Sequence, residues 1–366
     1  FVFNHCCTPG PRQGRCVPGA FAASTILNLA AMCYIHGGSA AWLASSVGVR
    51  PPRRHYLFKR RVFPPNNRLP GAYRFEVSLV ASIRIGPAGI PLSCKGRTIK
   101  DGVIYTRNLE LDAIQVQFVR GIRTTEEEAL EVGRVAREAN VEVHVHAPYY
   151  TNLAGDQSNL EMAFDKIVSA GALADAMGAR TLAIHCGLYD DAGPEKTMEI
   201  VTGSIGELLD TFKQDGIKVR LGLEVAGKQA LFGTLEEILE VCRRVPGTIP
   251  VLDFAHIHAR SNGGLQTQED FQKVFDACRF LNLPEYLLHF TGVLYDNGSE
   301  RHHLPIKKGD LRFEPLVDVI LDNEYNVTLI SESPILEHDA MYMQIVFDRV
   351  KEKREQKAAK DLEERE

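Results

Sequence analysis

Two hydrophobic patterns alternate along most of this chain. Short runs of β-branched and other apolar residues, typical of buried strands, recur about every 28 to 40 residues from Ile83 onward. Between them, apolar residues at i, i+3 and i+4 indicate amphipathic helices. The predicted strands are Ile83–Gly86, Ala113–Val119, Val141–Ala147, Arg180–His185, Lys218–Glu224, Ile249–Asp253, Tyr286–Phe290 and Asn326–Ser331. The predicted helices include Glu126–Ala139, Leu160–Met177, Lys196–Lys213, Leu235–Arg244 and Phe271–Phe280.

Eight strands that alternate with helices predict an α/β fold, a closed (β/α)8 TIM barrel. An open doubly wound sheet would more often carry a glycine-rich phosphate loop after its first strand. The segment Gly86-Pro87-Ala88-Gly89 is too short and is interrupted by proline, so it does not match that loop. We therefore assign residues 83–350 to one barrel domain and residues 351–366 to a charged, solvated C-terminal tail.

Residues 1–82 show neither pattern. They hold ten Lys or Arg residues, a single acid, Glu76, and eight of the eighteen prolines. We assign them no fold and consider two interpretations: a basic, unstructured extension, or upstream sequence translated in frame, with initiation near Val77 or Val80. We favour the second, because the stretch lacks the Ser, Glu, Lys and Gln bias typical of disordered segments.

The cysteines suggest neither a zinc module nor a disulfide framework. Cys6, Cys7 and Cys16 lack the paired spacing of a zinc module. The four cysteines after residue 82 are widely spaced, which suits a reducing, cytoplasmic compartment.

Composition and charge narrow the class of protein further. The apolar share of 45% and the charged share of 24% are those of a globular domain. The most apolar stretch, Ala20 to Tyr34, is short for a membrane span and contains Asn28. Residues 83–366 hold 32 bases and 46 acids, a net charge of −14. This acidity is an objection to DNA binding, although bound cations would make a site locally positive.

The candidate chemistry lies at the ends of the predicted strands. Carboxyl-terminal strand ends converge on one mouth of a β/α barrel. Six consecutive strands end at, or just before, a residue type that ligates metals. These residues are His146, His185, Glu224, Asp253 with His256, His289 and Glu332.

One such residue would ordinarily be a hydrogen-bonded rim residue, but six in a row predict a metal site. Burying so many ionisable groups together is costly without a compensating cation. Mixed imidazole and carboxylate ligands suit zinc, manganese or iron better than calcium or magnesium. Cys186, next to His185, should point toward the surrounding helices and pack there. The segment 300–303 after the seventh strand could complete a third metal position.

These motifs resemble the endonuclease IV family of apurinic/apyrimidinic (AP) DNA repair nucleases, and its archaeal members in particular. The similarity covers residues 83–350. The matching stretches are Arg84-Ile85-Gly86-Pro87-Ala88-Gly89-Ile90-Pro91, His146-Ala147-Pro148-Tyr149-Tyr150-Thr151-Asn152-Leu153, Ile184-His185, Leu223-Glu224-Val225-Ala226-Gly227, Leu252-Asp253-Phe254-Ala255-His256, Leu288-His289-Phe290, Arg301-His302-His303 and Ile330-Ser331-Glu332.

The resemblance implies a site for three zinc ions, with manganese as an alternative metal. The first zinc would be held by His146, His185 and Glu224, and the second by Glu224, Asp253, His289 and Glu332. The third would be held by His256, Glu300 and His302. The family usually has Asp where Glu300 stands, and His303 aligns as well as His302, so both histidines remain candidates.

The implied activity is hydrolysis of the phosphodiester 5′ to an abasic site in double-stranded DNA, which leaves a 3′-hydroxyl. Glu224 would bridge two cations, and Glu332 would both ligate and orient the nucleophile. Arg120 and Tyr149 are the candidate DNA contacts, and Lys228, Lys307 and Lys308 could contact phosphates. We expect a cytoplasmic monomer that acts in base excision repair.

Two other functions stay open. A sugar isomerase or epimerase of the xylose-isomerase-like class needs only a four-ligand site equivalent to Glu224, Asp253, His289 and Glu332. It does not require His146, His185, His256 or the segment 300–303, so the complete ligand set favours the nuclease. A non-catalytic DNA-end binder is the third possibility.

Overall fold

The structure, a computed structural model, describes residues 81–119 and 121–364. The proposed extension at 1–82 therefore lies almost entirely outside the described residues. The candidate DNA contact Arg120 lies outside them as well.

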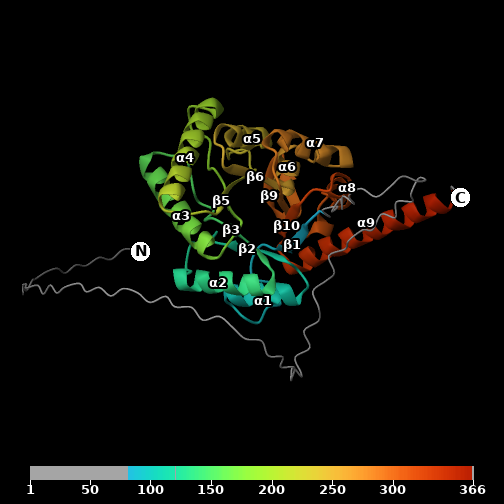
Figure 1. The fold of residues 1–366 in the computed structure, drawn as a ribbon. Helices are drawn as coiled ribbons and strands as arrows, with labels where there is room; N and C mark the ends of the chain where they lie inside the picture. Colours follow the sequence, from blue (N-terminus) through green and yellow to red (C-terminus); the bar gives the residue numbers. More distant parts are fainter. Residues whose placement is uncertain (1–80, 120, 365–366) are drawn as a thin grey trace, which may run out of the picture. The chain divides into compact units, whose positions relative to one another are not determined.

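Eight parallel strands form the barrel, and each predicted strand corresponds to one of them. They are β1 (Ile83–Pro87), β2 (Ala113–Gln117), β3 (Glu142–His146), β4 (Thr181–Ile184), β5 (Arg220–Glu224), β6 (Thr248–Asp253), β7 (Tyr286–Phe290) and β10 (Val327–Ser331). Their order in the sheet is β1-β10-β7-β6-β5-β4-β3-β2. The predicted TIM barrel is thus confirmed, and Figure 1 shows the strands at the centre with the helices around them.

The ring closes between β1 and β2. A parallel bridge joins Ala88 to Gln115, and the backbone nitrogen of Asp112 donates to the carbonyl of Ile85 at 3.1 Å. Gly86 makes this closure possible, because a Cβ at that position would lie 1.6 Å from the carbonyl oxygen of Ala113. A side chain there would push the two strands apart.

Helices cover the outside of the ring. They are α1 (Ile99–Asn108), α2 (Glu126–Ala139), α3 (Gln157–Ala176), α4 (Pro194–Gln214), α5 (Leu235–Arg244), α7 (Gln268–Cys278), α8 (Glu314–Asn323) and α9 (Glu337–Glu363). Helices α2 and α5 have the predicted bounds. A threonine precedes each of these helices, and its hydroxyl accepts a hydrogen bond from the backbone nitrogen of the third helical residue. That residue is a glutamate, whose side chain accepts a hydrogen bond from the backbone nitrogen of the threonine.

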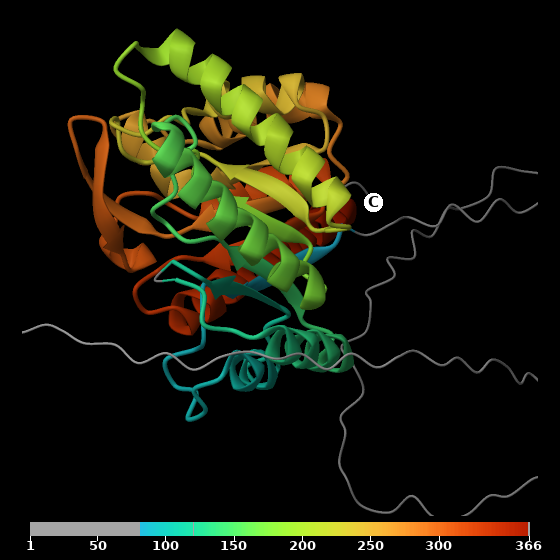
Figure 2. The ribbon, with the colours of Figure 1, turned by 90° about the vertical axis from the view of Figure 1, so that its left-hand side faces the viewer.

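Among the described residues, five further elements interrupt the simple alternation of strands and helices. Helix α6 (Phe254–Arg260) follows β6 directly, and a hairpin of β8 (Gly292–Asp296) and β9 (Ser299–Leu304) follows β7. The short 3-10 helices η1 (Arg279–Leu281) and η2 (Ile306–Lys308) complete the connections. Figure 2 shows the hairpin, in orange, standing outside the ring of strands.

The predicted C-terminal tail begins inside helix α9, which continues to Glu363. Arg354, near the start of the tail, forms ion pairs with Asp318 and Asp322 of α8. These ion pairs hold this part of α9 against the barrel. Within the described part of the chain, no helix combines the length and the apolar character needed to cross a membrane.

The hydrophobic core lies between the strands and the helices and inside the ring of strands, away from the polar side chains at the strand ends. The outer faces of the strands pack against the helices in two large apolar clusters. A small cluster of Ala113, Ala183, Val251, Leu287 and Ile330 comes from the strands alone. Cys186 lies fully buried in one of the large clusters, as expected.

Candidate metal centre

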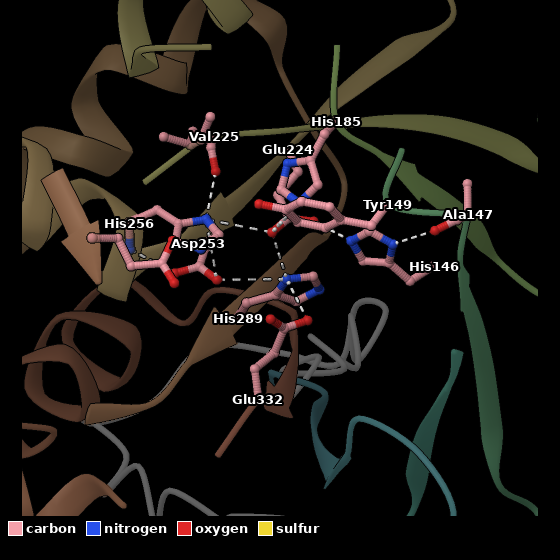
Figure 3. Close-up of polar contacts among 12 residues, drawn as sticks. His146, Ala147, Tyr149, His185, Glu224, Val225, Asp253, His256, His289 and Glu332 are labelled. Atoms are coloured by element: carbon pink, nitrogen blue, oxygen red, sulfur yellow. Dashed lines mark hydrogen bonds and ion pairs between the residues drawn. The ribbon is translucent and has the colours of Figure 1, made fainter. Parts of the chain in front are cut away.

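Eight acidic and imidazole side chains meet at the carboxyl-terminal end of the barrel. Seven of them come from the strand ends and from the start of α6, and Figure 3 shows these side chains pointing toward a common centre. They divide into three groups whose candidate ligand atoms lie within 4.8 Å of one another. The groups are His146, His185 and Glu224; Glu224, Asp253, His289 and Glu332; and Asp253, His256 and His303.

The first group lies at the ends of β3, β4 and β5. Nε2 of His146 lies 2.9 Å from one carboxylate oxygen of Glu224, and Nε2 of His185 lies 3.8 Å from the other. All three side chains are buried. Two imidazoles therefore face one carboxylate without competition from bulk solvent.

The second group surrounds Nδ1 of His289 with carboxylates. This nitrogen lies 3.2 Å from Glu332 Oε1, 3.4 Å from Glu224 Oε1 and 3.8 Å from Asp253 Oδ2. Glu224 thus belongs to both the first and the second group. Such a shared carboxylate can hold two cations close together.

The third group joins α6 to the hairpin. Nε2 of His256 lies 3.4 Å from Nε2 of His303 and 3.4 Å from Glu300 Oε2. Nε2 of His303 lies 3.5 Å from the other oxygen of Glu300. Asp253 takes part in the second and third groups, so shared carboxylates connect all three.

Of the two histidines that were candidates for the third position, His303 lies in a ligand group and His302 does not. His302 is exposed and belongs to none of the groups, whereas His303 faces His256. Across the hairpin, Leu294 pairs with His302 but Tyr295 pairs with Glu300, so β9 contains one extra residue. Regular alternation would place Glu300 and His302 on one face, and this β-bulge places Glu300 and His303 together instead.

Several buried polar atoms in the centre have no hydrogen-bond partner in the part of the chain that the structure describes. They are Nδ1 of His185, Oε1 of Glu224, Oδ2 of Asp253 and Nδ1 of His289. A buried polar group without a partner costs about 1–3 kcal/mol. Three of these atoms lie on the shared or central ligands, so this donor set fits bound cations.

The carboxylates and imidazoles strongly shift one another's protonation. Burial alone would raise the pKa of Glu224, but His185, His289 and His146 outweigh it and hold that pKa well below its ordinary value. Burial alone would lower the pKa of His289, but Glu332 and Glu224 raise it to about 10. The pKa values of His146 and His256 are raised as well, so without cations protons on these three imidazoles help to balance the buried negative charge.

Backbone carbonyls fix the orientation of three imidazoles. Nδ1 of His146 donates to Ala147 at 2.8 Å, and Nδ1 of His256 donates to Val225 at 2.7 Å. Nδ1 of His303 lies 3.1 Å from the carbonyl oxygen of Glu332. A carbonyl only accepts hydrogen bonds, so Nδ1 carries the hydrogen and Nε2 remains free to ligate.

Two supporting residues were not predicted from the sequence. The side-chain amide of Gln115 lies 2.8 Å from Nε2 of His289, which leaves Nδ1 of that ring facing the carboxylates. Gln115 is itself held by Gln117 at 2.7 Å. The position of Gln115, a polar residue inside the apolar run Ala113–Val119, is the sequence feature that could have indicated its role. His258, on α6 and fully buried, is the second such residue.

A glycine lets the loop after β5 approach the third group closely. A Cβ on Gly227 would lie 2.6 Å from the ring of His256 and 2.7 Å from Glu300. The carbonyl of Gly227 also accepts a hydrogen bond from the backbone nitrogen of Glu300 at 2.9 Å. Gly227 therefore helps to bring the hairpin against α6.

The candidate DNA contacts lie at different distances from the ligands. The ring of Tyr149 packs edge-on against His185 with centroids 5.0 Å apart, and Nζ of Lys228 lies 3.5 Å from its hydroxyl. Lys307 instead lies over the ring of Tyr342 at 4.3 Å, and Lys308 is exposed. Of the proposed contacts that the structure describes, Tyr149 and Lys228 are thus directly linked to the candidate metal centre.

The pattern of one protein family extends over most of the barrel. The xylose isomerase-like TIM barrel pattern matches residues 104–363. This chain belongs to that family. Among its relatives, an uncharacterized protein of Methanocaldococcus jannaschii is 28% identical over 263 residues, which cover 70% of this chain and 94% of the relative. A probable endonuclease 4 of Metamycoplasma arthritidis is 28% identical over 200 residues, or 53% of this chain and 70% of the relative.

Solved structures of other proteins share the fold. Endonuclease IV from Thermus thermophilus has a TM-score of 0.58 at 21% identity and covers 73% of this chain and 99% of its own. A D-tagatose 3-epimerase-like protein has a TM-score of 0.56 at 17% identity, with 72% and 96% covered. The predicted resemblance to endonuclease IV is therefore confirmed, and the same barrel occurs in proteins named for different reactions.

Proposed function

We propose that this chain is a zinc-dependent AP endonuclease that hydrolyses the phosphodiester 5′ to an abasic site in double-stranded DNA and leaves a 3′-hydroxyl. The observation that carries the proposal is the connection of three ligand groups through Glu224 and Asp253. The endonuclease 4 names of several relatives support it.

The chemistry explains why several cations suit this substrate. Bound dications would neutralise the phosphate, lower the pKa of a shared water and stabilise the leaving oxygen. Glu224 stays ionised because its pKa is held low, so it can bridge two cations near neutral pH. Glu332 lies in the second group but is less buried than Glu224, which suits a ligand that also orients the nucleophile.

Tyr149 and Lys228 would act on the DNA side of the centre. The phenol of Tyr149 lies beside His185, where it would contact the sugar or the phosphate of the opened nucleotide. The ammonium of Lys228 lies next to that phenol and would bind a phosphate oxygen. We expect the protein to act as a cytoplasmic monomer, with manganese as a possible substitute for zinc.

The test is incision of a duplex that carries one abasic analogue. We expect one metal-dependent cut 5′ to the lesion, no cut in the presence of a chelator, and a product that a DNA polymerase can extend. His146→Ala should abolish the cut. His338→Ala, which removes an exposed histidine at the start of α9, is the matched control and should leave it unchanged. Binding of the duplex without incision would contradict the proposal.

A sugar isomerase or epimerase is the second candidate, and one observation favours it. The second group alone, Glu224, Asp253, His289 and Glu332, provides the four ligands that such an enzyme needs. The metal content separates the two functions. Near three zinc ions per chain supports the nuclease, whereas one manganese per chain together with turnover of a ketose would replace it with the isomerase.

A further inference from the structure

Three side chains outside the candidate metal centre form a compact polar cluster near the turn of the hairpin. Oδ2 of Asp310, in the segment after η2, accepts a hydrogen bond from the hydroxyl of Tyr295 at 2.6 Å. Oδ1 of the same carboxylate lies 3.2 Å from Nε2 of His258. One carboxylate thus connects β8, helix α6 and the segment before α8.

The protonation of His258 follows from its neighbours. Its Nδ1 accepts a hydrogen bond from the backbone nitrogen of Leu265 at 3.2 Å, so that nitrogen carries no hydrogen. Nε2 therefore carries the hydrogen and donates it to Asp310. Because His258 is fully buried on α6, the carboxylate has a fixed partner on the helix side.

The backbone around the cluster leaves room for Tyr295. Gly263, just after α6, has a φ of +90°, and a Cβ there would lie 2.5 Å from the Tyr295 hydroxyl. The rings of Tyr295 and His258 pack perpendicular to each other with centroids 5.3 Å apart. The tyrosine is therefore seated in one orientation against α6.

The position of Tyr295 in the hairpin connects the cluster to the metal centre. Tyr295 is the residue that pairs with Glu300 across the hairpin, at the point where the register shifts. Glu300 lies on β9, which also carries His303, and α6 carries His256. The cluster thus fixes the distance between the two elements that supply the third ligand group.

We propose that Tyr295, Asp310 and His258 form a clamp of positioning residues that holds the hairpin against α6 and so sets the affinity of the third cation. This inference rests on the metal cluster of the proposed function. Other contacts also hold the hairpin, among them the hydrogen bond from Glu300 to Gly227. Loss of the clamp should therefore loosen the third group without removing it.

The experiment measures the bound zinc per chain across a series of buffered free-zinc concentrations. In Asp310→Ala the first two zinc ions should bind as in the wild type, and the third about 10-fold more weakly, the lower end of the range for lost supporting contacts. Tyr295→Phe should show a smaller loss. The double variant should match Asp310→Ala, because both changes break one connection. The visible spectrum of the cobalt-loaded protein should change only in the bands of the third ion.

A matched control separates positioning from folding. Tyr325→Phe also removes one phenol hydroxyl, just before β10 at the opposite end of the barrel, where the ring stacks on Phe275. It should leave all three affinities unchanged. Two results for Asp310→Ala would overturn the clamp. One is an equal loss of affinity for all three zinc ions, and the other is an affinity for the third zinc within twofold of that of the wild type.

The outcome is distinct from that of the DNA assay. A wild-type chain with three zinc ions, a clamp-dependent third ion and no incision would refute the nuclease and leave the clamp standing. A wild-type chain that binds fewer than three zinc ions would refute the clamp.

Discussion

The ligands that the barrel strands carry and those that the hairpin carries are held in different ways. Glu224, Asp253 and His289 have no exposed surface, and parallel strands fix them on both sides. Glu300 and His303 keep 12% and 21% of their side chains exposed, and β8 is the only strand of the described residues with which their strand pairs. The first two cations should therefore bind in a rigid frame, whereas the third depends on how well an added element is held.

The largest effect should come from the carboxylate that two groups share. Glu224→Gln removes a charge that faces His146, His185 and His289, so both strand-borne groups lose an anionic ligand. We expect more than about a 100-fold loss of incision and of zinc affinity, beyond what a supporting residue contributes. Zinc content and incision rate measure it. His303→Ala should remove only the third ion, and equal zinc loss in both variants would erase the contrast between the two regions.

The pH dependence of stability should reverse when cations are removed. Burial alone would lower the pKa of His256, but Asp253, Glu300 and Glu224 outweigh it and raise that pKa to about 9, from an ordinary value of 6.5. A raised folded-state pKa contributes stability that is complete below pH 6.5 and is lost as the pH rises through 9. The loss for His256 alone is on the order of 3 kcal/mol.

The chain treated with chelator should therefore become less stable from pH 6.5 to 9. In the zinc-loaded chain the ligands are already deprotonated, and zinc affinity rises with pH, so the slope should be opposite. Urea unfolding at several pH values, with chelator or with zinc, measures both slopes. Parallel slopes in the two conditions would show that protons and cations do not compete for these side chains.

A smaller effect is expected at the contact behind His289. Gln115→Leu removes the amide that lies 2.8 Å from Nε2 of that ring and keeps a similar volume. The second zinc should bind about 10- to 100-fold more weakly, while the third keeps its affinity. Gln117→Leu, which acts one step further away, should have a weaker effect of the same kind. A change confined to the third zinc would contradict the separation of the two regions.

The same division separates what the sequence could predict from what it could not. The strand-end ligands follow from two regularities: apolar runs mark the strands, and parallel strand ends meet at one mouth. The hairpin follows neither rule. The choice between His302 and His303 depends on one extra residue in β9, which the sequence does not mark. The sequence does not single out His258, because its neighbours Asp310 and Tyr295 are far away in the chain.

The smallest expected effect provides the sharpest test of this register. His302 is exposed, so His302→Ala should leave zinc content, incision and stability within experimental error of wild type. His303→Ala changes the same residue type one position further along the same strand, and it removes the nitrogen that lies 3.4 Å from Nε2 of His256. The pair of variants is matched in residue type, strand and substitution, and differs only in the face of the hairpin. Loss of the third zinc in His302→Ala, with normal binding in His303→Ala, would mean that the hairpin follows regular alternation in solution and that the bulge is absent.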